Sequence, residues 1–216
     1  MPRRPPRKLD PALDLSRNFR HAEELPVPFD PLPLFGRDGE WEVEVGSGKG
    51  LFLANATVQN PQRDFLGIEV AHKFALSAAG RLAKAGVTNG VVVSGDALKL
   101  FREWIPNARL SAVHVYFPDP WWKKRHRKRR VMNDALLNDI ERTLLPGGIL
   151  HFWTDVEEYF QATLEIMTKH PLLEGPLPVA EKSAEHDLDY RTHFERRMRM
   201  HELPVYRAEF RRSNSH

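Results

Sequence analysis

Five acidic residues stand at or near the ends of successive short apolar segments, each of which we expect to be a strand. They are Glu44, Glu69, Asp96, Asp119 and Asp155. The carboxyl ends of parallel strands meet at one edge of a sheet, and open α/β sheets bind ligands at that edge. We therefore expect these carboxylates to line one site, and a row of carboxylates suits a cationic ligand.

A glycine-rich stretch, EVGSGKG at residues 44–50, follows the first of these strands. Its glycines permit a tight turn and let backbone N–H groups approach a ligand. The dinucleotide pattern G-x-G-x-x-G needs its third glycine one residue later, and a phosphate-binding P-loop needs Ser or Thr where Gly50 stands. The remaining pattern resembles the first motif of S-adenosylmethionine-dependent methyltransferases. A sulfonium tolerates Glu44, whereas a pyrophosphate would be repelled; the alternative is a turn that only packs a helix on a strand.

Three of the carboxylates have a second interpretation. Glu69 lies where nucleotide-binding folds place an acid on ribose hydroxyls, or it is a solvated strand end. Asp96 can accept from an adenine amino group or cap the helix that begins next to it. Asp155 can bind a ligand or belong to a capping box at the start of another helix.

The most distinctive stretch is FPDPWWKKRHRKRR at residues 117–130. Two prolines fix the backbone around Asp119, two tryptophans offer flat stacking surfaces, and a basic run follows. Aromatic rings that stack on unpaired bases, with cations for phosphates, are typical of proteins that bind nucleic acids with exposed bases. The alternatives are a solvated or nuclear-localisation segment for the basic run, and core packing for Trp122.

Short strands alternating with helical stretches predict right-handed βαβ units, and so an α/β protein with a doubly wound, mostly parallel sheet. We expect strands at residues 41–45, 65–70, 91–94, 111–117 and 149–153. We expect helices at residues 51–58, 73–85, 97–104, 131–145 and 157–170. Residues 172–179 and 205–210 are candidate edge strands, with a helix in 181–202. The proline-rich, basic residues 1–35 read as an extended, flexible arm, and residues 36–216 as the domain.

Composition narrows the classes further. The chain has 216 residues and no cysteine, which excludes disulfides, thiolate metal sites and cysteine nucleophiles. The basic run 123–130 holds seven of the 32 Lys and Arg residues, and the remaining 25 face 29 Asp and Glu. No apolar stretch approaches the roughly 20 residues of a membrane span, and no signal peptide is evident, so we expect a cytoplasmic protein. The ten histidines show no metal-binding spacing, so we expect no metal.

Together, the motifs GSGKG, FLGIEV, GDA, FPDPW with its basic run, FWTDVEEY and THFE resemble the bacterial tRNA (guanine-N7-)-methyltransferase family. The resemblance runs from about Trp41 to the C-terminal region, and FPDPW with the basic run is far more specific than the glycine loop. It implies a Rossmann-like class I methyltransferase with a seven-stranded sheet and helices on both faces. It also implies transfer of a methyl group from S-adenosylmethionine to N7 of a guanosine, at position 46 of the tRNA variable loop.

The resemblance assigns roles to residues of this chain, with Asp119 as the catalytic residue. The residues implied in cofactor binding are Glu44, Gly46, Gly48, Glu69, Asp96 and Asp119. Those implied in binding the substrate guanosine are Lys123, Asp155, Thr192, His193, Phe194 and Glu195. Those implied in RNA binding are Arg125, His126, Arg127, Lys128, Arg129 and Arg130. The chain departs from the family at Trp122, where many members have proline, and the arm has no counterpart. A monomer and a homodimer both suit the sequence.

The chemistry indicates what Asp119 does. Guanine N7 carries a lone pair and no proton, so the transfer is a direct displacement that needs alignment and no obligatory base. The purine gains positive charge, and we expect Asp119 to hold the guanine and stabilise that charge. Two other functions stay open: a dinucleotide-dependent oxidoreductase, disfavoured by the glycine spacing and the short chain, and a non-catalytic RNA-binding module, which would not bind S-adenosylmethionine.

Overall fold

The computed structural model describes residues 5–6, 8–179, 190 and 192–214. Within these residues, eight strands form one sheet in the order β1-β4-β3-β2-β5-β6-β8-β7. The strands are β1 (Phe19–His21), β2 (Trp41–Val45), β3 (Asp64–Glu69), β4 (Gly90–Ser94), β5 (Leu110–Tyr116), β6 (Leu144–Thr154), β7 (Leu173–Leu177) and β8 (Tyr206–Arg212). The strands β1 to β6 pair in parallel, whereas β8 runs antiparallel to both β6 and β7.

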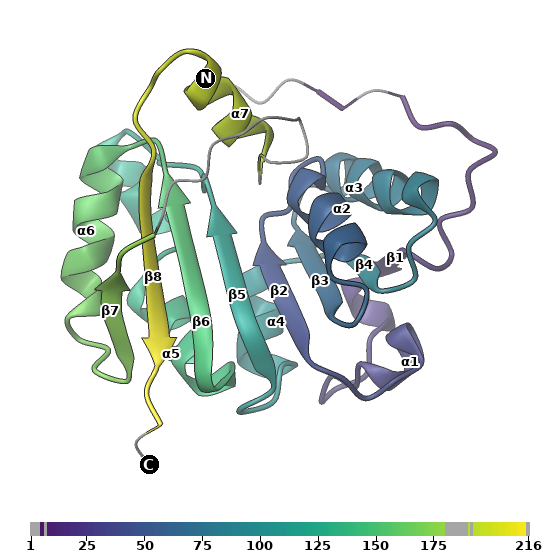
Figure 1. Ribbon diagram of the computed structural model, residues 1–216, viewed down its shortest axis with the longest axis horizontal. Coiled ribbons are helices and arrows are strands. Elements are labelled where there is room, and N and C mark those ends of the chain that lie inside the picture. The colour runs from purple at the N-terminus through teal and green to yellow at the C-terminus, as the bar shows by residue number, and fades with distance from the viewer. Residues whose placement is uncertain (1–4, 7, 180–189, 191, 215–216) are drawn as a thin grey trace.

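Helices cover both faces of this sheet (Figure 1). One face carries α2 (Leu51–Gln59) and α3 (His72–Ala85), and the other carries α4 (Ala97–Glu103), α5 (Asp134–Thr143) and α6 (Glu157–Met167). The helix α7 (His193–Met200) lies beyond the carboxyl ends of the central strands. Short helical turns form α1 (Leu32–Phe35), η1 (Ala22–Glu24) and η2 (Lys124–Arg129). The predicted doubly wound α/β fold is confirmed.

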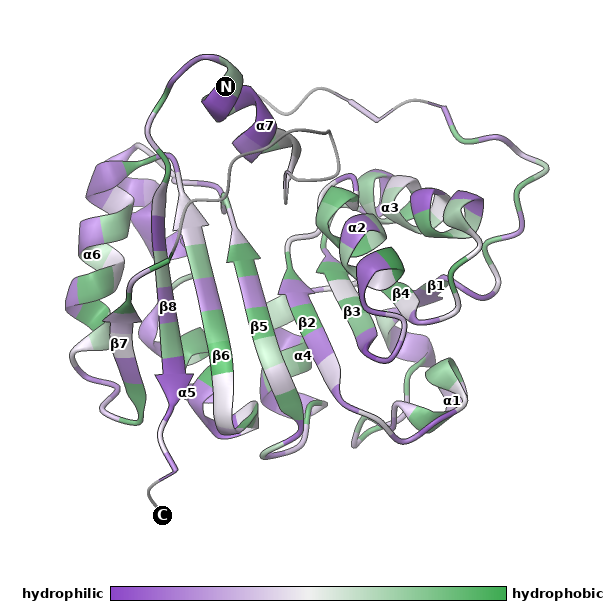
Figure 2. Cartoon of the chain, viewed as in Figure 1, coloured by the Kyte–Doolittle hydropathy of each residue, from purple (hydrophilic) through white to green (hydrophobic). Residues whose placement is uncertain are grey.

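The core has two parts, one on each side of the sheet. Branched side chains of the parallel strands, such as Val43 and Val113, pack with α4, α5 and α6 on one side. On the other side, Leu53 of α2 and Leu82 of α3 pack with Phe65 of β3. Figure 2 shows hydrophobic and hydrophilic bands along the central strands, and α7 as mostly hydrophilic. Burial on both faces explains the continuous apolar run of β4, whereas β2 is buried although its sequence alternates with glutamates.

Two features of the fold differ from the prediction. The sheet has eight strands and not seven, because three residues of the N-terminal segment 1–35 add β1 beside β4. That segment also packs against the domain: the Asn18 side chain donates to the carbonyl of Gly90 (2.8 Å), and the rings of Phe29 and Trp41 lie 5.0 Å apart. A three-residue strand is too short to show a period of two, so its pattern was not visible.

The predicted helix at residues 131–145 begins later, at Asp134, because Asn133 caps it by accepting from the N–H of Leu136. The predicted helix within residues 181–202 is α7, which starts at His193; residues 180–189 and 191 lie outside the described part of the chain, as does the side chain of His193. No helix in the described ranges is both long enough and apolar enough to cross a membrane.

Candidate active site

The glycine-rich loop at residues 46–50 joins β2 to α2 in the predicted place. Gly46, Gly48 and Gly50 all have positive φ (79°, 54° and 68°), which glycine adopts without strain. A Cβ on Gly50 would lie 2.7 Å from the Cβ of Ala78, so this glycine allows α2 and α3 to approach closely. A Cβ on Gly46 or Gly48 would meet nothing within 4 Å. The third glycine therefore serves packing, while the first two leave open space at the strand edge.

Glu69 is a buried carboxylate that braces this loop, so the alternative of a solvated strand end is wrong. It is only 2% exposed. One carboxylate oxygen accepts from the N–H of Gly48 and the other from the N–H of Ala71, both at 2.9 Å. Main-chain donors at both oxygens hold this side chain in a fixed orientation. The end of β3 and the glycine loop are thereby joined.

Glu44, at the end of β2, is buried beside Glu69. Burial raises the pKa of Glu44 to about 8, and the charge of Glu69 acts in the same direction. Its Oε2 atom has no hydrogen-bond partner among the described residues. A buried carboxyl with an unsatisfied oxygen is costly unless a ligand completes it, and a cation would favour its ionised form.

For Asp96 and Asp155, the structure decides the capping interpretation in opposite ways. Asp96 caps α4, since its side chain accepts from the N–H of Leu98 at 2.9 Å, so the capping interpretation is confirmed for this residue. The helix α6 has Val156 as its N-cap, with no side-chain cap hydrogen bond. The N–H of Val156 donates to Thr154, and not to Asp155. The capping interpretation of Asp155 is therefore wrong, and its half-exposed side chain stays a candidate ligand.

The loop that carries Asp119, residues 117–122, follows β5 and has a strained backbone. Phe117 (φ 49°) and Trp121 (φ 46°) adopt left-handed conformations that cost non-glycine residues energy. The N–H of Phe117 donates to the carbonyl of Trp153 (2.8 Å), and its ring stacks on that of Phe194 with centroids 5.8 Å apart. Pro118 and Pro120 on either side of Asp119, together with these contacts, define its position.

Arg130 lies inside this region although it ends the basic run. It is 7% exposed, and its Nε donates to the carbonyl of Pro120 at 2.8 Å. Its two terminal nitrogens bind the two carboxylate oxygens of Glu158, at 2.5 and 3.2 Å. The guanidinium also lies 4.5 Å from the centre of the Tyr159 ring. The Arg130 hydrogen bonds lower the pKa of Glu158.

The rest of the basic run forms η2 and lies on the surface. Arg125 and Lys128 are exposed. Arg129 lies over the ring of Trp121 at 5.1 Å, and Arg127 pairs with Glu158 at 3.2 Å. The sequence contains no cue for these internal contacts, because seven cations in eight residues look alike.

The two tryptophans of the loop have different surroundings. Trp121 is half-buried and packs against the edge of His126, with ring centroids 6.0 Å apart. Trp122 is 65% exposed, so the alternative of core packing is wrong for this residue. The adjacent Lys123 is also exposed. An exposed indole and an exposed ammonium therefore follow Asp119 on the surface.

The THFE motif opens α7, and part of its role is structural. Thr192 caps the helix by accepting from the N–H of Glu195 at 3.0 Å. The Glu195 carboxylate is buried and pairs with Arg199 and Arg207, each at 3.7 Å. The stack of Phe194 on Phe117 brings this motif to the Asp119 loop. The start of α7 therefore lies against the loop that follows β5.

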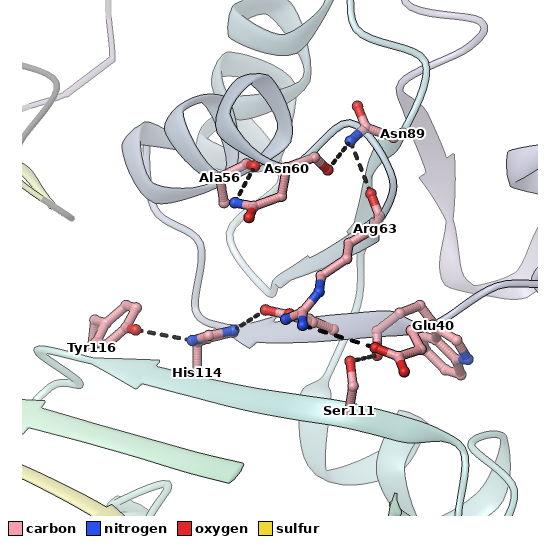
Figure 3. A network of polar contacts seen from close by, with 10 residues as sticks. Glu40, Ala56, Asn60, Arg63, Asn89, Ser111, His114 and Tyr116 are labelled. Atoms are coloured by element: carbon pink, nitrogen blue, oxygen red, sulfur yellow. Dashed lines mark hydrogen bonds and ion pairs between the residues drawn. The ribbon is translucent and has the colours of Figure 1, made fainter. Parts of the chain in front are cut away.

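A cavity of about 620 Å³ lies elsewhere, beside the amino-terminal halves of β2, β5 and β6. Its wall contains a polar network that the sequence analysis did not find (Figure 3). Glu42 binds His114 at 2.7 Å and Arg63 at 2.6 Å, and His114 also contacts the hydroxyl of Tyr116 at 2.9 Å. Although burial opposes ionisation, these partners hold the pKa of Glu42 at about 2. Because the network satisfies its own members, we assign it to the stability of the sheet.

The relatives of this chain accord with the geometry at the carboxyl edge. Residues 39–208 match the protein family described as "Putative methyltransferase". Over 98% of its length the chain is 47% identical to the tRNA (guanine-N(7)-)-methyltransferase of Rhodopirellula baltica, of which it covers 80%. The chain belongs to the tRNA (guanine-N7-)-methyltransferase family.

Other members of this family are longer than the region they share with the chain. The enzyme of Aeromonas hydrophila is 39% identical over 66% of this chain, which spans about three fifths (60%) of that enzyme. Among solved structures, the 16S rRNA methyltransferase KamB aligns with a TM-score of 0.58 over 84% of this chain and 91% of its own, at 17% identity. That likeness shows the fold, and the family's cofactor is S-adenosylmethionine. Among the described residues of the present chain, no three His, Asp or Glu side chains form a group that could hold a metal ion.

Proposed function

We infer that this chain transfers the methyl group of S-adenosylmethionine to N7 of a guanosine in tRNA. The observation that carries this inference is the position of two loops. The glycine loop follows β2 and the Asp119 loop follows β5, and these strands are neighbours where the strand order reverses. Ligands of doubly wound sheets bind at this switch point. The two segments with chemical character therefore face one site.

The residues at the end of β2 suit S-adenosylmethionine. The unsatisfied Glu44 carboxyl and the braced Glu69 carboxylate favour a cationic ligand over a pyrophosphate. Gly46 and Gly48 leave open space for a ligand against the backbone, and Asp96 lies just beyond the end of β4, the strand that pairs with β3. We propose that these five residues, with Asp119, hold the cofactor, which supplies an electrophilic methyl group when bound.

On the substrate side, we propose that Asp119 orients the guanine by accepting from its N1–H or its exocyclic amine. N7 has no proton to lose, so Asp119 acts by position and charge, stabilising the positive charge that the purine gains. Lys123, Asp155 and the THFE residues Thr192, His193, Phe194 and Glu195 are proposed to bind the same nucleoside. Phe194 already lies against the Asp119 loop through its stack on Phe117.

The tRNA surface in this proposal is η2 with the two residues before it. The exposed cations Arg125 and Lys128 would bind phosphates, and the exposed face of Trp122 would stack on a base. The tryptophan replaces the proline of many relatives, so this stacking is a feature of the present chain. We place the activity in the cytoplasm, where its substrate is found.

One experiment tests the function directly. Unmodified tRNA is incubated with the protein and S-adenosylmethionine, and mass spectrometry maps N7-methylguanosine along the RNA. We expect one modified guanosine in the variable loop. Binding of the cofactor, measured by calorimetry, separates the alternatives. A chain that binds tRNA but does not bind the cofactor and transfers no methyl group would be an RNA-binding module. Methylation of another atom or of another RNA would contradict the proposal.

A further inference from the structure

Arg130 differs from the exposed cations of its run in its burial and in its hydrogen bond to the backbone of the Asp119 loop. Arg125 and Lys128 are exposed, whereas Arg130 is 7% exposed. Burial of a guanidinium is tolerated when its donors are bound and its charge is paired. Both conditions hold here, because the backbone of the Asp119 loop and the carboxylate of Glu158 take donors of Arg130. The charge of Arg130 is therefore compensated by Glu158 within the protein.

The contacts of Arg130 connect the Asp119 loop to α6. The bond to the carbonyl of Pro120 fixes the residue directly after Asp119 at 2.8 Å. The paired bonds to Glu158, at 2.5 and 3.2 Å, have the two-pronged geometry that holds a guanidinium in one orientation. The ring of Tyr159 supports the flat face of the same group at 4.5 Å. Burial raises the pKa of Tyr159 to about 12, and the charge of Asp119 contributes to this rise.

The loop needs such a restraint because its backbone is strained on both sides of Asp119. Phe117 and Trp121 keep positive φ values only if neighbouring contacts impose them. At the first of these positions, the hydrogen bond to Trp153 and the stack on Phe194 supply the contacts. At the second, Arg130 holds the preceding carbonyl, and Arg129 lies over the indole.

We propose that Arg130, held by Glu158, is a positioning residue for Asp119 and not an RNA contact. This inference rests on the proposed function, since it gives Asp119 its role in the methyl transfer. In this proposal Arg130 acts by holding the Pro120 carbonyl and not by binding the cofactor or the guanine. Loss of Arg130 should therefore lower the rate of methyl transfer at saturating substrates, and leave the electrostatic part of tRNA binding unchanged.

The test compares Arg130→Met with Arg125→Met, which removes a cation of the same run from the surface. For Arg130→Met we expect kcat to fall between about tenfold and a hundredfold, since small displacements of catalytic groups have effects of this size. The dependence of tRNA affinity on salt should match that of the wild type. For Arg125→Met we expect weaker tRNA binding with a shallower salt dependence.

A readout independent of activity keeps the result interpretable. Hydrogen exchange at the amide of Phe117, which is bonded to Trp153, should speed up in Arg130→Met and not in Arg125→Met. If Arg130→Met does not fold, Glu158→Gln tests the same link from a half-exposed position, where we expect a smaller fall in kcat in the same direction. An unchanged kcat in Arg130→Met would overturn the proposal, and a shallower salt dependence in that variant would show that Arg130 binds RNA. A wild-type protein inactive on tRNA would instead overturn the proposed function, while faster exchange would still show the restraint.

Discussion

The glycine loop at residues 46–50 and the Asp119 loop at residues 117–122 leave neighbouring strands, and both adopt left-handed backbone, but different forces hold them. In the first loop, three glycines take positive φ without strain. In the second, Phe117 and Trp121 take similar φ values at a cost, and side chains from other segments hold them. One loop is defined by its own residue types, and the other by its surroundings.

This difference matches the tasks proposed for the two loops. A cofactor that is the same in every turnover suits a loop whose shape needs no partner. A large RNA has to be aligned on one atom, and a loop held by α6, α7 and β6 responds to all three elements. The following predictions test whether the two loops separate in this way, starting with the largest expected effect.

Asp119 should carry the chemistry of its loop. We expect Asp119→Ala to lower the single-turnover rate by about a hundredfold or more, because a fixed charge near a developing cation acts mainly in the transition state. Asp119→Asn keeps the shape and removes the charge, so it should also lose most of the rate. Quenched-flow measurements with labelled methyl groups would give these rates. Nearly full turnover in Asp119→Asn, with unchanged cofactor binding, would show that the charge of Asp119 is not used.

Gly50 should be the most sensitive position of the cofactor loop for stability. In Gly50→Ala, the new Cβ would overlap Ala78 of α3 in a left-handed conformation, and we expect a loss of about 2–4 kcal/mol in the free energy of unfolding. Gly86→Ala is the matched control, since its φ is also positive (66°) but nothing lies within 4 Å of the new Cβ. There, strain alone should cost roughly 1–2 kcal/mol. Equal losses in urea denaturation would show that the contact with α3 is unimportant.

The same contrast explains which parts of the molecule are predictable from the sequence. The start of α2 after β2 follows from glycines and apolar runs that lie together in the chain, and the structure agrees within a residue or two. The capping role of Asp96 was also one of two local alternatives. By contrast, the burial of Arg130 depends on Glu158 and Tyr159, which are 28 and 29 residues later in the sequence. Local pattern does not distinguish it from the exposed cations beside it.

The network around Glu42 and the strand β1 were missed for related reasons. Glu42 alternates with apolar residues in β2, as a half-exposed strand would, and only the fold shows that His114 of β5 meets it. The strand β1 lies in a segment rich in proline and basic residues, which is typical of an arm, and it forms because the edge of β4 is free to pair. Pairing across more than 70 residues depends on topology and leaves no local signal.

Glu44 should couple cofactor binding to pH. Its pKa of about 8 means that the carboxyl is largely neutral at pH 6, while a cationic cofactor favours its ionised form. Binding should therefore release up to one proton, and affinity should rise with pH by up to about tenfold per unit until pH 8. Calorimetry in buffers of different ionisation enthalpy measures the released proton.

Glu44→Gln is the control for this coupling, because the amide is neutral at every pH. We expect weaker cofactor binding with no rise between pH 6 and pH 8. In the protein without cofactor, the pH dependence of stability has the opposite sign. The folded wild type keeps a proton that the unfolded chain loses above about pH 4.5, so its stability should fall relative to that of Glu44→Gln as pH rises to 8. A parallel pH dependence of cofactor affinity in the two proteins would show that Glu44 stays protonated when the cofactor is bound.

The smallest effects should come from the surface beside the Asp119 loop, where we propose that Trp122 and Arg125 bind RNA by different forces. Trp122→Ala removes an exposed stacking face and should weaken tRNA binding by about 1–2 kcal/mol, with the salt dependence unchanged. Arg125→Met should reduce the salt slope by about one unit or less, the share of one phosphate contact. Fluorescence anisotropy of labelled tRNA over a series of salt concentrations measures both quantities. If Trp122→Pro, which restores the residue of many relatives, binds as tightly as the wild type, then the indole adds no stacking and Trp122 is only a tolerated substitution.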